Sequence, residues 1–178
     1  GDASFAIAGK KLAITVPGGV SHDIWTDGYT APRVMQDLKD FANVYEFGVK
    51  FTTPLVGSGN NIMVQGIVAE QDSNNLLRAN FSYDGSSLRI FIAGFYDGLS
   101  QPEVLANEVL TGGTSNLWLR LTQGGGTFRI YYSLNGTSWT FIPSFPRPLN
   151  ITKVGVFAGN GGASPQTFTC SAEYVATT

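Results

Sequence analysis

The chain has 178 residues, of which 43% are hydrophobic and 13% charged, and its formal net charge is −2. This composition predicts a folded domain with a substantial core and excludes a long disordered tail, and so small a charge gives no reason to expect a nucleic acid partner. No apolar run is long enough to cross a bilayer, so the sequence predicts no membrane insertion, and its length favours a single domain over residues 1–178.

Short stretches that alternate apolar and polar residues follow one another along the chain, separated by glycine-rich turns. Such alternation predicts strands, and Asn135-Gly136 is the strongest hairpin signal. Residues 35–41 fit either one short helix or a turn. Strands at this spacing without helices between them predict an all-β sandwich or barrel. The predicted strands include residues 12–16, 45–51, 76–83, 88–92, 117–122, 128–133, 153–159 and 167–174.

The single cysteine, Cys170, falls in the last predicted strand. One thiol forms no intrachain disulfide, so the fold must be held together by its core. We expect Cys170 to be a buried small hydrophobe. A catalytic thiol would need a nearby base, and the only histidine, His22, is far away in the sequence.

A polar and aromatic segment, residues 21–36, lies between two apolar strands. Asp23 and Trp25 are two residues apart, so in an extended chain they point to the same side. With Arg33 they would form a polar pocket floored by an aromatic ring. Alternatively, Trp25 plugs the open end of the sandwich while Asp23 accepts backbone N–H groups. Tyr29 is the more favoured contact residue of this segment.

A second set of candidate binding residues lies on the predicted outward faces of the central strands. Planar guanidinium and amide groups bind vicinal hydroxyls, and aromatic rings stack on sugars, so such a face suits a carbohydrate. An ordinary solvated face with cross-strand pairs is the alternative. The residues are Gln65, Arg78, Asn80, Trp118, Arg120 and Tyr131.

Three of these residues are expected to form one exposed patch. Arg78 and Asn80 share the face opposite the core, and Gln65 lies on the preceding strand. We therefore expect Arg78→Ala to abolish ligand binding and leave the melting temperature nearly unchanged. The alternative is a surface ion pair between Arg78 and Glu46.

The stretches LWLRLTQGGGTFRIYYSLNGTSWTFI and KVGVFAGNGG resemble the second half of concanavalin A-like lectin/glucanase sandwich domains. The similarity is closest to a bacterial family of unassigned function related to the C-terminal sandwich of β-xylosidases. Asp23-x-Trp25 and the stretch from Ala31 to Gln36 also fit that family, whereas the C-terminal strand departs from its usual aromatic ending. The matching residues of the second half are Trp118, Arg120, Tyr132, Ser133, Asn135, Gly136, Trp139, Val154, Gly155 and Gly159.

The resemblance implies a two-sheet antiparallel jelly-roll sandwich that forms part of a larger secreted or cell-surface bacterial protein and binds polysaccharide. Glucanases of this superfamily carry Glu-x-Asp-x-x-Glu, whereas this chain has Glu70-x-Asp72-x-x-Asn75. Asn75 cannot transfer a proton, so we expect no enzyme activity. The alternatives are a structural or adhesive spacer domain without a small ligand, or a degenerate glycoside hydrolase.

The sequence predicts no metal centre, and its only candidate ligands for a cation lie in turns. One histidine is too few for a typical zinc site. Calcium is possible at the turns that contain Asp72, Asp84 and Asp97, but aspartates also cap turns without any metal. The sequence predicts no other cofactor.

Overall fold

The computed structural model describes residues 1–26, 28–38, 45–57, 61–124, 127–142 and 149–174. These residues form fifteen strands and contain no helix, which confirms the predicted all-β class. The strands are β1 (Ser4–Ala8), β2 (Lys11–Val16), β3 (Ile24–Trp25), β4 (Gly28–Tyr29), β5 (Arg33–Asp37), β6 (Tyr45–Phe51), β7 (Asn61–Asp72), β8 (Asn75–Tyr83), β9 (Leu88–Phe95), β10 (Glu103–Leu110), β11 (Leu117–Gly124), β12 (Thr127–Ser133), β13 (Thr140–Ile142), β14 (Lys153–Gly162) and β15 (Phe168–Tyr174).

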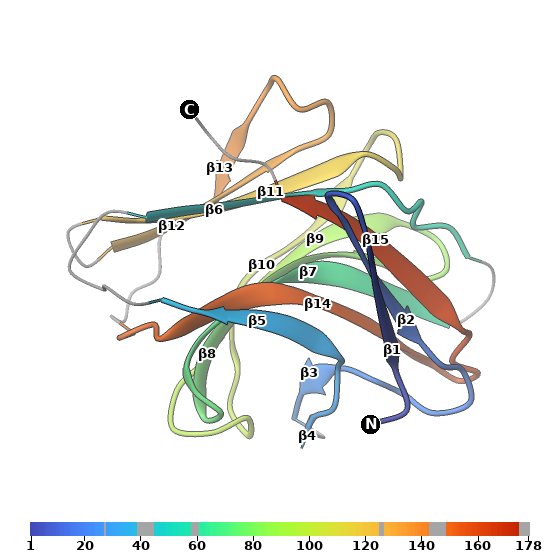
Figure 1. Cartoon of the computed structure of the whole chain (residues 1–178), viewed down its shortest axis with the longest axis horizontal. Helices are drawn as coiled ribbons and strands as arrows, with labels where there is room; N and C mark the ends of the chain where they lie inside the picture. Colours follow the sequence, from blue (N-terminus) through green and yellow to red (C-terminus); the bar gives the residue numbers. More distant parts are fainter. Residues whose placement is uncertain (27, 39–44, 58–60, 125–126, 143–148, 175–178) are drawn as a thin grey trace.

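The strands form two packed antiparallel sheets, so the predicted sandwich is confirmed (Figure 1). The seven-stranded sheet has the order β1-β2-β15-β6-β11-β12-β13, and the six-stranded sheet has the order β10-β9-β8-β7-β14-β5. The short pair β3-β4 forms a third, two-stranded sheet below the six-stranded one (Figure 1).

The main core lies between the two large sheets and follows from the alternation of the strands. On β8 the buried Leu77, Ala79 and Phe81 face inward, and Leu119 of β11 faces them from the other sheet. Full burial of one such large side chain stabilises the fold by about 1.5–3 kcal/mol. Cys170 is completely buried in this core, as expected, and burial raises the pKa of its thiol.

A second apolar cluster covers the outer face of the six-stranded sheet. Ile24 and Ala31 pack there against side chains from four strands of the sheet, with Trp25 at the margin. Because both faces of the sheet are covered here, β7 is buried at every position from Val64 to Glu70. Segment 21–32 therefore covers a second apolar core on the outer face of the six-stranded sheet. The sheet residues of the cluster are Val64, Val68, Leu76, Ala93, Phe95 and Phe157.

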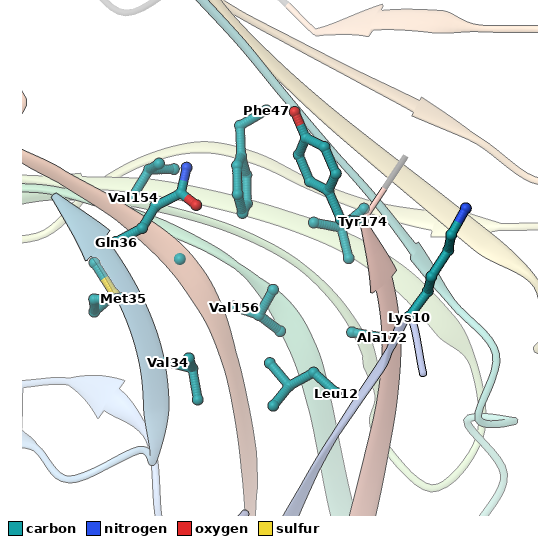
Figure 2. A pocket seen from close by; sticks show the side chains of 12 residues that line it. Lys10, Leu12, Val34, Met35, Gln36, Phe47, Val154, Val156, Ala172 and Tyr174 are labelled. Carbon is teal, nitrogen blue, oxygen red and sulfur yellow. The ribbon is translucent and has the colours of Figure 1, made fainter. Parts of the chain in front are cut away.

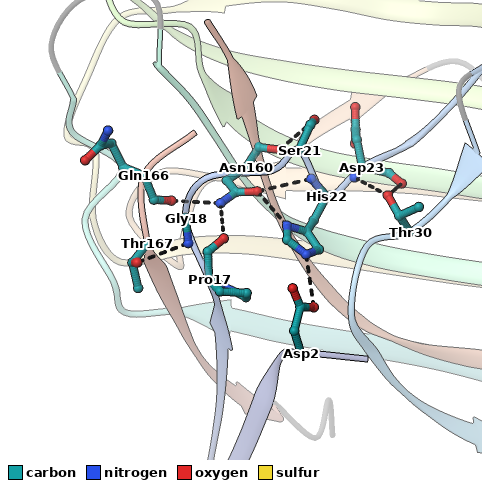
Figure 3. A network of polar contacts seen from close by, with 10 residues as sticks. All are labelled: Asp2, Pro17, Gly18, Ser21, His22, Asp23, Thr30, Asn160, Gln166 and Thr167. Atoms are coloured by element: carbon teal, nitrogen blue, oxygen red, sulfur yellow. Dashed lines mark hydrogen bonds and ion pairs between the residues drawn. The ribbon is translucent and has the colours of Figure 1, made fainter. Parts of the chain in front are cut away.

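Segment 21–32 is attached to β14 through His22 and Asn160. Their backbone N–H and C=O groups exchange two hydrogen bonds of 3.0 Å. The Asn160 amide nitrogen donates to the carbonyl oxygens of Pro17 and Gln166, each at 2.8 Å, and its Oδ1 lies 3.1 Å from the His22 ring (Figure 3). One buried amide thus joins three parts of the chain.

One predicted element is wrong. Residues 35–37, which begin the possible helix, belong to β5, an edge strand that pairs with β14 from Arg33↔Phe157 to Asp37↔Lys153. Residues 39–41 of that prediction lie outside the described residues. Pairing with the neighbouring strand satisfies the backbone of β5 and overrides its weak local preference.

Candidate functional site

Arg78 lies on the outer face of the six-stranded sheet and makes three hydrogen bonds and two contacts with aromatic rings. Its Nε donates to Asn80 Oδ1 at 2.9 Å, and its Nη1 donates to Asp23 Oδ1 at 2.8 Å and to the carbonyl oxygen of Ile24. The guanidinium lies 5.3 Å from the ring centroid of Phe91 and 5.2 Å from that of Phe157. Only 3% of the side chain is exposed, and desolvation lowers its pKa while Asp23 opposes this change.

Asp23 has one fixed and one available carboxylate oxygen. Its Oδ1 accepts both the Arg78 hydrogen bond and the Ile24 backbone N–H at 2.8 Å. Its Oδ2 makes no hydrogen bond within the described part of the chain, and 37% of the side chain is exposed. Asp23 thus accepts one backbone N–H, as the alternative expected, while Trp25 packs on the outer apolar cluster of the six-stranded sheet and not at the open end of the sandwich. The second carboxylate oxygen of Asp23 remains available as an acceptor.

Trp25 lies beside Asp23 and is half-buried. Its ring meets Phe91 and Phe95 edge-on, with centroid distances of 5.5 and 5.9 Å. Asp23 and Trp25 both line a cavity of about 180 Å³, together with Ser21, Gly28 and Thr30. We call this cavity the Asp23 pocket. As predicted, the aspartate and the tryptophan face the same space.

Arg33 does not join the Asp23 pocket, contrary to the expectation. Its Nε donates to Glu70 Oε1 at 3.1 Å, and its guanidinium lies 3.6 Å from the centroid of the Tyr29 ring. The Tyr29 hydroxyl donates to the same Glu70 oxygen. Strand register aligns Arg33 with Phe157 and Glu70 with Lys153, so the two residues are not cross-strand neighbours. Their side chains nevertheless meet, and the cation is engaged by that carboxylate. In the sequence, Glu70 was recognisable only as a possible catalytic group, and no local pattern indicated its contacts with Tyr29 and Arg33.

The expected exposed patch of Gln65, Arg78 and Asn80 is absent. Gln65 pairs with Phe81, so it faces the main core, where its Nε2 donates to the Thr53 carbonyl oxygen at 3.2 Å. Arg78 and Asn80 share the outer face, but segment 21–32 covers them, and Asn80 is completely buried. Arg78 pairs with Asp23 and not with Glu46. The expectation that Arg78→Ala leaves stability unchanged does not fit this burial.

The other three predicted residues lie on the outer face of the seven-stranded sheet. Trp118 and Arg120 of β11 point outward, and Tyr131 of β12 is the direct partner of Arg120. The Arg120 guanidinium lies 4.7 Å from the centroid of Tyr131 and 4.4 Å from that of Trp139. The ten predicted residues therefore separate between the outer sides of the two sheets and one position in the main core, and Arg78 and Asn80 are buried beneath segment 21–32. Trp139 was not among them, although the hairpin at Asn135-Gly136 indicated its place.

Two of the three aspartates considered for calcium, Asp72 and Asp84, cap turns. Asp72 Oδ1 accepts the backbone N–H groups of Asn74 and Asn75 at 2.8 and 2.9 Å. Asp84 Oδ2 accepts from Arg89 Nε at 2.7 Å, and this hydrogen bond is the main cause of its lowered pKa. No three histidine, cysteine, aspartate or glutamate side chains of the described ranges form a group suited to a metal ion. The third candidate, Asp97, has a positive φ of 61°.

Two other cavities are less suited to a sugar. An apolar one of about 200 Å³ opens between the edges of the sheets, with Lys10 and Gln36 at its rim and side chains such as Leu12, Phe47 and Val156 inside (Figure 2). It offers few groups that bind hydroxyls. The other, of about 470 Å³, lies between β1 and β5, but its His22 is engaged with Asp2 at 3.2 Å and with Asn160. None of the described residues forms a helix that could cross a membrane.

Neither a family model nor a curated protein matches the sequence. Several solved structures match the fold. A functionally unknown protein from Saccharomyces cerevisiae has a TM-score of 0.69 at 16% identity, with 98% of this chain and 92% of that chain covered. The GH43 protein BlXynB from Bacillus licheniformis has a TM-score of 0.67 at 19% identity, with 94% and 33% covered, so this chain spans about a third of its length.

A third structure, the carbohydrate binding module CBM66 from Bacillus subtilis, has a TM-score of 0.50 at 12% identity, with 97% of this chain and 88% of that chain covered. At identities below 20%, these similarities show only that the chain shares the β-sandwich fold of these proteins. Its function must be inferred from the chemistry of its own site.

Proposed function

We propose that the protein is a non-catalytic carbohydrate-binding module and that the Asp23 pocket is its binding site. The observation that carries this proposal is the hydrogen bonding of the two Asp23 carboxylate oxygens. A buried arginine and a backbone N–H fix one oxygen, and the other remains available beside a half-buried tryptophan. A carboxylate oxygen accepts hydrogen bonds from sugar hydroxyls, while an indole ring packs against the apolar face of a pyranose.

Contacts within the protein hold the Asp23 carboxylate in position, which favours binding. Arg78 is held between two aromatic rings and by Asn80, and it in turn orients Asp23. A ligand therefore meets an acceptor whose position is already set, so little conformational entropy is lost on binding.

The same geometry favours binding over hydrolysis. Cleavage of a glycosidic bond uses two carboxyl groups that flank the bond. Among the described residues that line the pocket, Asp23 alone carries a carboxyl group. Glu70 is engaged by Tyr29 and Arg33, and Asp72 caps a turn with Asn75. The similarity to a carbohydrate binding module supports this proposal.

The setting that we propose is extracellular, as one domain of a larger bacterial protein that acts on or holds polysaccharide. The fold makes up about a third of the GH43 protein from Bacillus licheniformis, which supports a role beside other domains. A spacer domain without a small ligand is the alternative, and it would bind no glycan in the experiment below.

The test is isothermal titration calorimetry with xylohexaose and a panel of neutral plant oligosaccharides, one of which should bind. Asp23→Asn keeps an acceptor for the Ile24 N–H but removes the charge, and we expect it to weaken binding about tenfold or more, since hydrogen bonds to charged groups contribute roughly 1.5–3 kcal/mol. Asp84→Asn, a turn carboxylate outside the pocket, is the matched control and should bind like the unaltered protein. Equal affinities of the two variants would place the sugar elsewhere.

A further inference from the structure

The outer face of the seven-stranded sheet carries a second cluster of aromatic and cationic side chains. Strand register makes them direct neighbours: Lys50 pairs with Trp118, Arg120 with Tyr131, and Tyr131 with Phe141. This sheet and the β3-β4 pair lie on opposite sides of the molecule (Figure 1), so the cluster is separate from the Asp23 pocket. We call it the cation–aromatic face. It consists of Lys50, Trp118, Arg120, Arg129, Tyr131, Trp139 and Phe141.

The rings of this face are exposed to different degrees and lie close together. Phe141 is 46% exposed, and Tyr131 and Trp118 are half-buried. The centroids of Tyr131 and Phe141 are 5.3 Å apart, with an angle of 44° between the rings. They sit on adjacent strands of a sheet whose strands repeat about every 4.8 Å. Such a surface offers stacking contacts along a line rather than in one pocket.

The cations of this face are poorly neutralised by the protein. The Arg120 guanidinium lies between Tyr131 and Trp139, its Nη1 is 3.7 Å from Glu46, and its Nε is buried without a hydrogen bond within the described ranges. Lys50 Nζ lies 5.4 Å above Trp118. Glu173 is next to Lys50 in register, but its carboxylate binds Lys11 at 3.2 Å.

Arg129 is exposed and, like Lys50, takes part in no ion pair among the described residues. The outward charged side chains of this sheet are thus four cations and two carboxylates, on a chain whose net charge is −2. The cations are Lys11, Lys50, Arg120 and Arg129, and the carboxylates are Glu46 and Glu173.

We propose that the cation–aromatic face is a second glycan-binding surface and that its ligand is an acidic polysaccharide. Sugar rings would lie on Trp118, Tyr131 and Phe141, and the carboxylates or sulfates of the polymer would meet Lys50 and Arg129. This surface differs from the Asp23 pocket in position and in the charge of its ligand. A module with both sites links two glycan chains, one on each side of the sandwich.

The experiment is native affinity electrophoresis in gels that contain polygalacturonate, with fully methyl-esterified polygalacturonate as the comparison polymer. Methyl esterification removes the negative charge of the carboxylates and leaves the sugar rings and their linkages unchanged. We expect polygalacturonate to retard the protein, the ester to retard it much less, and the retardation to fall as salt is added. The double variant Lys50→Gln/Arg129→Gln should raise the apparent Kd about fivefold or more. Tyr131→Ala should weaken binding to both polymers.

A charge-matched control is the double variant Lys153→Gln/Arg89→Gln, which removes two cations from the other sheet. It should bind polygalacturonate like the unaltered protein. Equal losses in the two double variants would show non-specific charge attraction, and equal retardation by both polymers would show a neutral glycan surface. Either result overturns the proposal, as does a complete lack of retardation.

The two sites can fail separately. Asp23→Asn should lose neutral oligosaccharides in calorimetry and still be retarded by polygalacturonate. If the Asp23 pocket binds no oligosaccharide, the electrophoresis still tests whether the cation–aromatic face binds polygalacturonate. All altered positions on that face are at least partly exposed, so melting curves should show folded protein throughout.

Discussion

Arg78 joins the sheet to the segment that covers it. Two of its nitrogens hold Asn80, Asp23 and the carbonyl oxygen of Ile24, and two aromatic rings enclose its flat group. A buried arginine without these partners would be strongly unfavourable, because the cation has lost its water. The same side chain therefore serves stability and the orientation of Asp23.

Replacing Arg78 by methionine should lower the free energy of unfolding by about 2–4 kcal/mol, since Asn80 Oδ1 stays buried without its donor while Asp23 is hydrated only in part. Arg89→Met, which breaks the Arg89–Asp84 pair at the surface, should cost no more than about 1 kcal/mol. Urea denaturation of both variants measures the difference. Similar losses would mean that Arg78 contributes no more than an ordinary surface ion pair.

Segment 21–32 is held on the sheet by backbone contacts that require glycine on β14. A Cβ added at Gly159 would come within 2.5 Å of the carbonyl oxygen of His22, which is a backbone atom. A Cβ at Gly161, on the same face of the same strand, would meet the hydroxyl of Ser21 at 3.3 Å, and that side chain can rotate away. The two positions thus differ in the atom that an added Cβ would meet, a fixed backbone oxygen at Gly159 and a rotatable hydroxyl at Gly161.

We expect Gly159→Ala to displace the segment and to destabilise the protein by about 1–3 kcal/mol, the usual cost of overpacking. Hydrogen exchange should accelerate at the amides of His22, Thr30 and Ala31, whose acceptors are the carbonyl oxygens of Asn160 and Asp23. Gly161→Ala should change these rates little. Protection that is equal in both variants would show that the segment is held by its apolar side chains alone.

At the scale of the whole molecule, the first two strands and the last strand of the described residues belong to one sheet. β15 lies between β2 and β6, so strands from the beginning and the end of the chain are neighbours. Cys170 lies in the middle of this arrangement, opposite Ile14. Pairings so distant in sequence form only when most of the chain is folded.

We therefore expect the Cys170 thiol to react with a disulfide reagent only after global unfolding, because it is buried and its pKa is raised by that burial. The free energy obtained from labelling rates in increasing urea should equal the free energy of unfolding followed by tryptophan fluorescence. The variant Cys170→Ser has no thiol and therefore measures the background signal of the reagent. Labelling at a lower free energy would reveal that β1, β2 and β15 open as a separate unit.

The sequence by itself determined which side chains share a face. Alternation identified Leu77, Ala79 and Phe81 as core residues, and the two-residue spacing placed Asp23 and Trp25 on one side. Both conclusions depend only on the period of two in an extended chain. The same rule correctly set Arg78 opposite the core.

What only the tertiary structure decided was which outer face is covered and how strands pair. Alternation cannot reveal that a segment 55 residues away in sequence lies over Arg78, so this arginine was expected at the surface. The register of the β7–β8 hairpin turned Gln65 inward, and pairing with β14 made a strand of residues that fitted a helix. Period is a local property of the chain, whereas burial of a second face depends on contacts between distant segments.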